Sequence, residues 1–386
     1  MMHEEEKSDL PIVPAKPVNK AASAAAESPS RLRVFDTTGS GGTKRNAGQQ
    51  STDRTQCRET VSQTQARIRE AVSRNPKEKL TALAHHATVD ALKSAFFNLK
   101  KRAAAGVDEV TWSDYAADLD RNLTDLHARV QRGAYRALPS RRVYIPKSDG
   151  KLRPLGIATM EDKLVQAAVV MILTPVYEAE FLGFSYGFRP GRNQHVVPKA
   201  RFAASCRRRA SPRRAEGALR RDALDALAFG IKARKVCWVL DADISRFFDA
   251  ISHDWLIKFV RHRIGDERII RLIQKWLKAG VLEDGQRHET VEGTPRRGEA
   301  RGARRAVISP LLANIYLHYV YDLWVVQWRR RANGDMIVVR YADDTIVGFQ
   351  HEGDAERFLI DLKARLAQFG LSLHPEKTSA LRIPKY

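Results

Sequence analysis

The sequence is poor in cysteine and in long uninterrupted apolar runs. Its three cysteines, Cys57, Cys206 and Cys237, show no paired spacing, which excludes a disulfide framework and gives no sign of a zinc site. The two longest apolar stretches, residues 164–177 and 307–328, are interrupted by proline and polar residues that a bilayer core would penalise. The polar N-terminus lacks the apolar segment of a secretory signal. These absences predict a cytoplasmic protein with no membrane partner.

Basic residues clearly outnumber acidic residues in this chain. The 386 residues include 66 Lys+Arg and 45 Asp+Glu, which gives a formal net charge of +21. Residues 199–221 hold nine basic residues against one acidic residue, and residues 296–305 hold five against one. More than half of the net charge therefore lies in two short segments. Such a balance favours a polyanionic partner.

Composition divides the chain into three parts. Residues 1–78 are rich in small and polar side chains and nearly empty of aromatics, so we expect a disordered, basic N-terminal arm. From Leu80 onward, apolar residues recur at spacings of three and four, which predicts that a folded domain begins there with a helix. We expect residues 79–235 and 236–386 to form its two successive parts.

The apolar pattern of those two parts predicts helices and strands in mixed order. The Asp149-Gly150 pair between two apolar runs is typical of a hairpin turn, and Ser252 is suited to cap a helix. The predicted strands are residues 143–145, 152–157, 236–240, 336–340 and 345–349, and the predicted helices are residues 160–177, 269–278 and the segment after Ser252. This order favours an α+β fold with an antiparallel sheet.

Two aspartate clusters interrupt the predicted strands. Asp241 and Asp243 end one strand, and Asp343 and Asp344 occupy the turn between two others. Mg²⁺ prefers hard oxygen ligands and takes one or two from the protein, while water and substrate phosphates supply the rest. Paired carboxylates on strands therefore indicate a magnesium site for nucleotidyl transfer. The alternative is that these are solvated turn residues, because Asp is common in turns.

Five motifs, which follow one another along the chain in the order found in the family, carry a family resemblance. Tyr341-Ala342-Asp343-Asp344, between two apolar strands, resembles the palm motif of reverse transcriptases, and residues 243–253 resemble the other metal-binding palm motif. The three remaining motifs are residues 153–157, 185–191 and 309–314. Together the motifs are similar to those of group II intron-encoded reverse transcriptases, the maturase family, over about residues 80–380.

This resemblance implies a fold and a function. Residues 79–235 would form the fingers and the start of the reverse transcriptase domain, and residues 236–386 the palm with its antiparallel sheet, with the thumb absent. The activity would be RNA-directed DNA polymerisation by two-metal nucleotidyl transfer, associated with intron splicing and mobility. The implied partners are an RNA template, intron RNA, a DNA primer and deoxynucleoside triphosphates.

The resemblance also implies the catalytic residues. Asp243, Asp343 and Asp344 match the three catalytic acids, which would hold two Mg²⁺ ions together with the backbone carbonyl of Ile244. Phe248 matches an aromatic residue that lies against the sugar 2′ position and favours deoxynucleotides. Its alternative role is ordinary core packing.

Basic and aromatic residues of the first part match binding positions of the family. Lys147 and Arg153 match residues that hold the incoming triphosphate, although they could also belong to a solvated strand face. Tyr186, Arg189 and Arg192 lie in a segment that borders the template in the family, where arginine neutralises phosphate and rings stack on bases. A purely structural turn is the alternative for that segment.

The sequence departs from the family pattern in three places. Residues 296–306 stand where the family has Gln-Gly-Gly near the incoming nucleotide, and residues 196–221 form a second Arg-rich insertion. Tyr386, the last residue, follows Asp344 by 42 positions, before the expected thumb. These departures leave open a catalytically impaired relic or a non-enzymatic RNA-binding protein.

Overall fold

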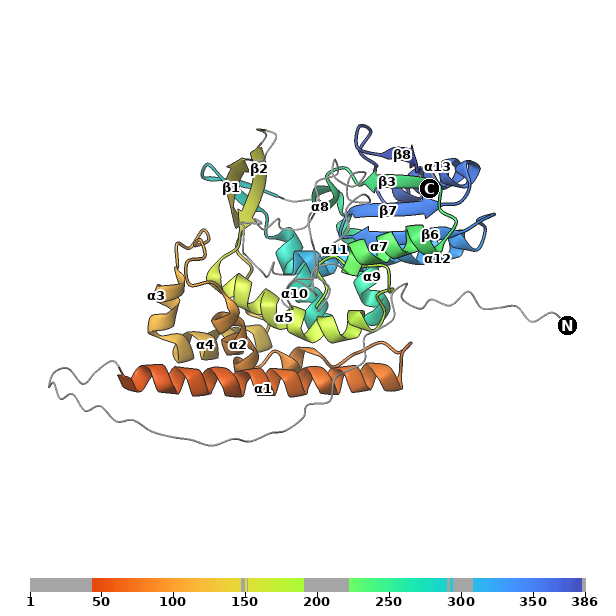
Figure 1. Cartoon of the computed structure of the whole chain (residues 1–386). Coiled ribbons are helices and arrows are strands. Elements are labelled where there is room, and N and C mark those ends of the chain that lie inside the picture. Colours follow the sequence, from red (N-terminus) through yellow and green to blue (C-terminus); the bar gives the residue numbers. More distant parts are fainter. Residues whose placement is uncertain are drawn as a thin grey trace, which may run out of the picture.

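The computed structural model describes residues 44–146, 150, 152–190, 222–289, 292–293 and 308–383. Two four-stranded sheets stand over a helical base (Figure 1). This mixture of helices and antiparallel strand pairs confirms the predicted α+β class. Both Arg-rich insertions lie outside the described residues. No described helix is both long enough and apolar enough to cross a membrane.

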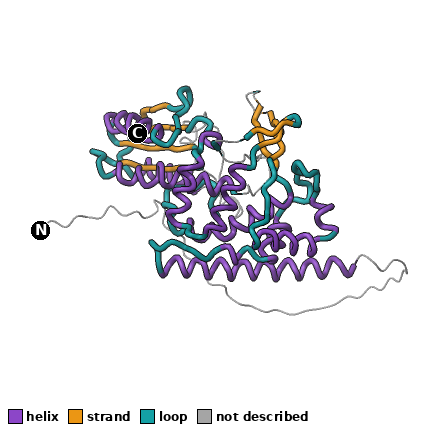
Figure 2. The backbone as a smooth tube through the Cα atoms, turned by 180° about the vertical axis from the view of Figure 1, so that it is seen from behind, coloured by secondary structure: helices purple, strands orange, loops and turns teal. Residues whose placement is uncertain are grey.

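The base is formed by α1 (Lys44–Arg74), α2 (Val89–Asn98) and α5 (Met160–Glu178). In both views, α1 runs along the underside of the other helices (Figures 1 and 2). The expectation of a disordered arm is therefore wrong for residues 44–74. Cys57, Ile68 and Val72 of α1 are at most 4% exposed, and they form a narrow apolar stripe on an otherwise polar helix. The rest of that expected arm, residues 1–43, lies outside the described residues.

The smaller sheet has the strand order β2-β1-β4-β5. Strands β1 (Ser140–Pro146) and β2 (Leu152–Ile157) pair antiparallel, which confirms the predicted hairpin, and Gly150 in the connection has a φ of +76°. Strand β4 (Val281–Glu283) pairs parallel to β1, and β5 (Gln286–His288) pairs antiparallel to β4.

The larger sheet has the order β6-β7-β3-β8, and all its neighbours are antiparallel. Its strands are β3 (Trp238–Asp243), β6 (Met336–Tyr341), β7 (Asp344–Phe349) and β8 (Ser379–Arg382). Alternation along β6 directs Met336 and Val338 to one face and Ile337 and Val339 to the other, and both sets are buried.

Helices cover both faces of the larger sheet. Helix α7 (Asp222–Ala233) packs on the Ile337 face, while α13 (Glu352–Ala367) packs on the opposite face. One continuous helical path of α11 (Ser309–Leu317), η4 (His318–Asp322) and α12 (Leu323–Arg329) contacts α13 through η4. The sheet is therefore fixed from both sides, and its strand ends are held firmly.

The remaining helices complete the base and the region between the sheets. They are η1 (Ala84–His86), α3 (Trp112–Ala117), α4 (Leu119–Gln131), α8 (Phe247–Ala250), α9 (His253–Arg263) and α10 (Glu267–Lys278). The Ser252 side chain accepts a hydrogen bond from the Trp255 amide, which confirms the predicted cap. The predicted helix over 269–278 is likewise confirmed by α10.

Candidate active site

The two aspartate clusters meet at one end of the larger sheet. Asp243, the last residue of β3, lies directly opposite Asp344, the first residue of β7. Residues opposed in this way place their side chains on the same face of a sheet. Asp343 lies in the two-residue turn between Tyr341 and Asp344. The structure thus brings together acids that are 100 residues apart in the sequence.

Left-handed backbone conformations gather around these acids. Ala342 in the acidic turn has a φ of 54°, Arg246 just after β3 has 45°, and Phe188 has 59°. Such conformations are unfavourable for residues with a β-carbon and persist only where the surroundings impose them. The described part of the chain has five non-glycine residues with positive φ, and three of them lie here. Backbone strain is therefore concentrated at this end of the sheet.

The segment of residues 184–189 supports the acidic turn from one side. The Tyr186 amide donates to the Arg340 carbonyl and the Arg340 amide donates to the Phe184 carbonyl, both at 2.9 Å. Gly187 lies against Ala342, and a β-carbon on Gly187 would be 2.2 Å from the Ala342 nitrogen. The close approach of the two backbones therefore requires glycine at this position.

The structure does not support the expected nucleic-acid contact of Arg189. This residue is 6% exposed, and its guanidinium donates to the Glu178 carboxylate at 2.9 and 3.1 Å. It also donates to the carbonyls of Leu182 and Ser185, at 2.8 and 2.7 Å. Tyr186 is likewise 6% exposed and packs beneath α7. Both residues shape the segment from within, as the structural alternative expected.

Two other predicted binding residues, Phe248 and Arg153, lie on different parts of the fold. Phe248 is half-buried beside Phe247 and Phe188, with ring centroids 5.3 and 6.5 Å away. Phe188 also lies 6.3 Å from the Tyr341 ring, so Phe248 borders the acidic turn through one aromatic neighbour. Arg153 is on β2 opposite Ile145.

Two further predicted residues, Lys147 and Arg192, lie outside the described residues.

Sequence reasoning missed Lys377, whose ammonium nitrogen lies 3.3 Å from a carboxylate oxygen of Asp243. The chain reaches this position because residues 372–374 run beside the end of β3. The Ser245 amide donates to the Ser372 carbonyl, and the His374 amide donates to the Asp243 carbonyl, both at 2.8 Å. A single lysine in an irregular segment gives no signal in the sequence, so only the fold reveals this contact.

The carboxylates at this end of the larger sheet are oxygen ligands of the kind that Mg²⁺ prefers. In the part of the chain that the structure describes, no three His, Cys, Asp or Glu side chains gather as a complete ligand set. Mg²⁺ nevertheless needs only one or two protein carboxylates when water and phosphates complete its shell. The opposed Asp243 and Asp344, with Asp343 in the adjoining turn, meet that requirement. Lys377 shows in addition that Asp243 accepts a cationic neighbour.

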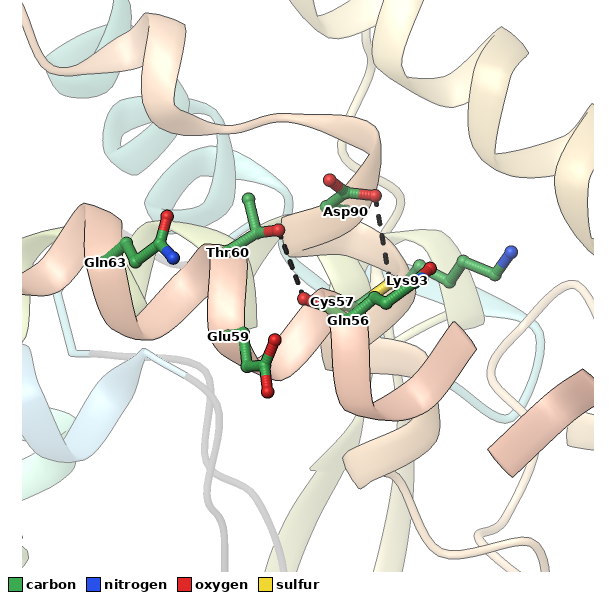
Figure 3. A pocket seen from close by; sticks show the side chains of 7 residues that line it. All are labelled: Gln56, Cys57, Glu59, Thr60, Gln63, Asp90 and Lys93. Carbon is green, nitrogen blue, oxygen red and sulfur yellow. Dashed lines mark hydrogen bonds between the residues drawn. The ribbon is translucent and has the colours of Figure 1, made fainter. Parts of the chain in front are cut away.

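A polar pocket of about 400 Å³ lies elsewhere, between α1 and α2 (Figure 3). Its lining residues are Gln56, Cys57, Glu59, Thr60, Gln63, Asp90 and Lys93. The Cys57 thiol donates to Asp90, and the Thr60 hydroxyl donates to the Gln56 carbonyl within the helix. None of the residues predicted for catalysis lines this pocket.

Comparison with known proteins agrees with the geometry of the acids. Residues 145–386 match the family model of reverse transcriptase (RNA-dependent DNA polymerase). Protein YkfC of Escherichia coli is 38% identical over 213 residues, which are 55% of this chain and 48% of YkfC. The group II intron-encoded protein LtrA of Lactococcus lactis is 40% identical over 200 residues, which are 52% of this chain and 27% of LtrA.

A third relative is a 91 kDa protein in the cob intron of Schizosaccharomyces pombe, 35% identical over 180 residues, which are 47% of this chain and 18% of that protein. The matched region thus spans at most about half the length of each of these relatives. The family model, by contrast, covers more than half of this chain, including all three acids. The chain therefore belongs to the reverse transcriptase family.

Proposed function

We propose that the chain is an RNA-directed DNA polymerase of group II intron type, which extends a DNA primer on an RNA template and acts with intron RNA in splicing and mobility. The observation that carries this proposal is the pairing of Asp243 with Asp344 across neighbouring strands, with Asp343 in the turn beside them. The family match and the similarity to LtrA support the choice of reaction.

In this proposal Asp243, Asp343, Asp344 and the Ile244 carbonyl hold two Mg²⁺ ions. Bound Mg²⁺ supplies Lewis-acid activation of the primer 3′-hydroxyl and neutralises charge on the departing pyrophosphate. The carboxylates are preorganised because the strands that carry them are fixed on both faces by helices. The contribution of the protein is thus positioning and charge.

Binding roles complete the proposal. Lys147 and Arg153 hold the triphosphate, and Phe248 lies against the sugar of the incoming deoxynucleotide. Arg192 contacts the nucleic-acid backbone. Support for Phe248 comes from its half-buried ring beside Phe188, next to the acidic turn.

The test compares Asp243→Asn and Asp343→Asn with the unmodified chain in primer extension on an RNA template. We expect extension to fall by at least about 100-fold, because loss of a direct metal ligand exceeds the 10–100-fold cost of losing an outer partner. RNA binding should be nearly unchanged. The matched control is Glu356→Gln, which removes one exposed acid on α13 and should leave extension intact.

The rival function is a non-enzymatic RNA-binding protein, which residues 296–306 in place of Gln-Gly-Gly would favour. If extension by the aspartate variants equals that of the unmodified chain, the assignment of the acids is wrong. If the unmodified chain binds RNA but does not extend the primer, the rival function holds.

A further inference from the structure

Arg340 is completely buried, with 0% of its surface exposed. A buried guanidinium is unfavourable unless it is paired and its hydrogens are bonded. Asp322 on η4 accepts two of its hydrogen bonds, at 2.6 and 2.7 Å, and so provides the opposite charge. The pair accounts for the charge of Arg340 but leaves further N–H groups that the fold must satisfy.

Those remaining N–H groups point to the structures around the acidic turn. One terminal nitrogen of Arg340 donates to the Ala342 carbonyl at 2.9 Å and to the Asn314 side chain at 3.1 Å. The other donates to the Ser185 hydroxyl at 2.7 Å. Because the guanidinium is planar and rigid, these contacts fix the turn relative to α11, η4 and the supporting segment.

A second set of contacts, made by Asn314 and Gly187, holds the acidic turn from another side. Asn314 donates from its amide to the Gly187 carbonyl at 2.7 Å, and Gly187 lies against Ala342 without space for a β-carbon. Ala342, with its left-handed backbone, is thus held between the Arg340 guanidinium and the Gly187 backbone. Such a conformation persists only where neighbouring groups impose it.

We propose that Arg340 is a positioning residue, which acts through the Ala342 carbonyl and residues 184–187 to hold Asp343 and Asp344 in the geometry that nucleotidyl transfer requires. This inference rests on the proposed function for its consequence in catalysis. It also makes a structural statement, that the acidic turn loses order when the guanidinium is removed, which can be tested without any activity.

The first variant is Arg340→Lys, which keeps a cation beside Asp322 but cannot reach Ala342, Asn314 and Ser185 together. Hydrogen exchange measured by mass spectrometry well below the melting temperature should show at least 10-fold faster exchange in peptides covering residues 341–345. Peptides from α13 should exchange as in the unmodified chain. In single-nucleotide extension, kcat should fall at least 10-fold while KM for the deoxynucleotide changes less than 3-fold.

The second variant is Gly187→Ala, which leaves the Arg340–Asp322 pair in place and pushes a methyl group against the turn. It should reproduce the same local exchange and the same fall in kcat. Its matched control is Gly353→Ala on α13, where nothing lies within 4 Å of the added carbon and neither quantity should change.

Unchanged exchange at residues 341–345 in both folded variants would overturn the proposal, as would a rise spread evenly over the molecule. An Arg340→Lys chain that fails to fold leaves the decision to Gly187→Ala. If the unmodified chain shows no extension, the proposed function fails, but the exchange data still decide whether Arg340 positions the turn.

Discussion

His318 lies buried beside the Arg340–Asp322 pair and is 4% exposed. Burial lowers the pKa of His318 to about 4 from the ordinary 6.5, and the nearby positive charges of Arg340 and Arg189 act in the same direction. The Asp322 carboxylate, 3.9 Å away, opposes this shift only in part. His318 is therefore neutral in the folded protein at neutral pH.

This histidine makes stability depend on pH in a defined direction. Its folded pKa lies below its unfolded pKa, so the unfolded chain takes up the proton first, and stability is lost as pH falls from 6.5 towards 4. Between pH 7.5 and pH 5.0 we expect a loss of about 2 kcal/mol from this group. Urea unfolding of the unmodified chain and of His318→Gln at both pH values measures the contribution of His318 to this loss, because the variant lacks the titrating ring.

The difference in unfolding free energy between the two chains should thus shift by about 2 kcal/mol in favour of the variant at pH 5.0. A difference that stays constant with pH would contradict the burial of a neutral His318 in this network.

Residues of the site differ in how far the sequence could predict them. Asp243, Asp343 and Asp344 were predictable because acids that end apolar strands violate the local pattern, and the structure brings them together. Arg340 and Lys377 were not, because their partners come from distant segments that no local pattern connects. Arg189 resembled a phosphate ligand in the sequence because composition does not reveal that Glu178 already binds it.

At the scale of elements, the docking of α1 is the clearest departure from expectation. Its buried residues Cys57, Ile68 and Val72 are 11 and 4 residues apart, about three turns and one turn of a helix, but mostly polar and basic side chains fill the positions between them. Average composition over the segment therefore indicated disorder, although a narrow stripe is enough to bind a helix to an existing apolar surface.

Ile68→Asp should destabilise the protein by about 3 kcal/mol or more, because the substitution removes buried apolar surface and buries a carboxylate. Thermal unfolding measures the effect. Ala66→Asp is the matched control, since it introduces the same side chain at an exposed position of the same helix and should change the melting temperature little. Equal melting temperatures for the two variants would show that α1 is not docked.

The start of α2 shows why element boundaries were harder to predict than elements. Spacing predicted a helix from Leu80, yet α2 begins at Val89 after a cap by Thr88. The Asp266 carboxylate accepts hydrogen bonds from the amides of Leu83 and Ala84, at 2.8 and 2.7 Å. A side chain more than 180 residues away therefore decides the conformation of this segment, which no local reading can anticipate.

At the scale of the whole molecule, the sequence predicted the α+β class, the β1–β2 hairpin and strands β3, β6 and β7 of the larger sheet, but not its edge strand β8. It did not predict that β4 pairs parallel to β1, joining Ser140 to Val281. Local alternation defines which residues form strands, but pairing between strands more than 100 residues apart depends on packing that only the complete fold contains.

Single-nucleotide addition on an RNA template measures directly whether this chain polymerises DNA. The unmodified chain is mixed with a DNA primer annealed to RNA, Mg²⁺ and one deoxynucleotide at a time. We expect addition of the nucleotide that is complementary to the template base, with release of pyrophosphate, and loss of this addition in Asp243→Asn. Absence of addition in a preparation that binds the RNA, or addition that ignores the template base, would contradict the proposed RNA-directed polymerisation.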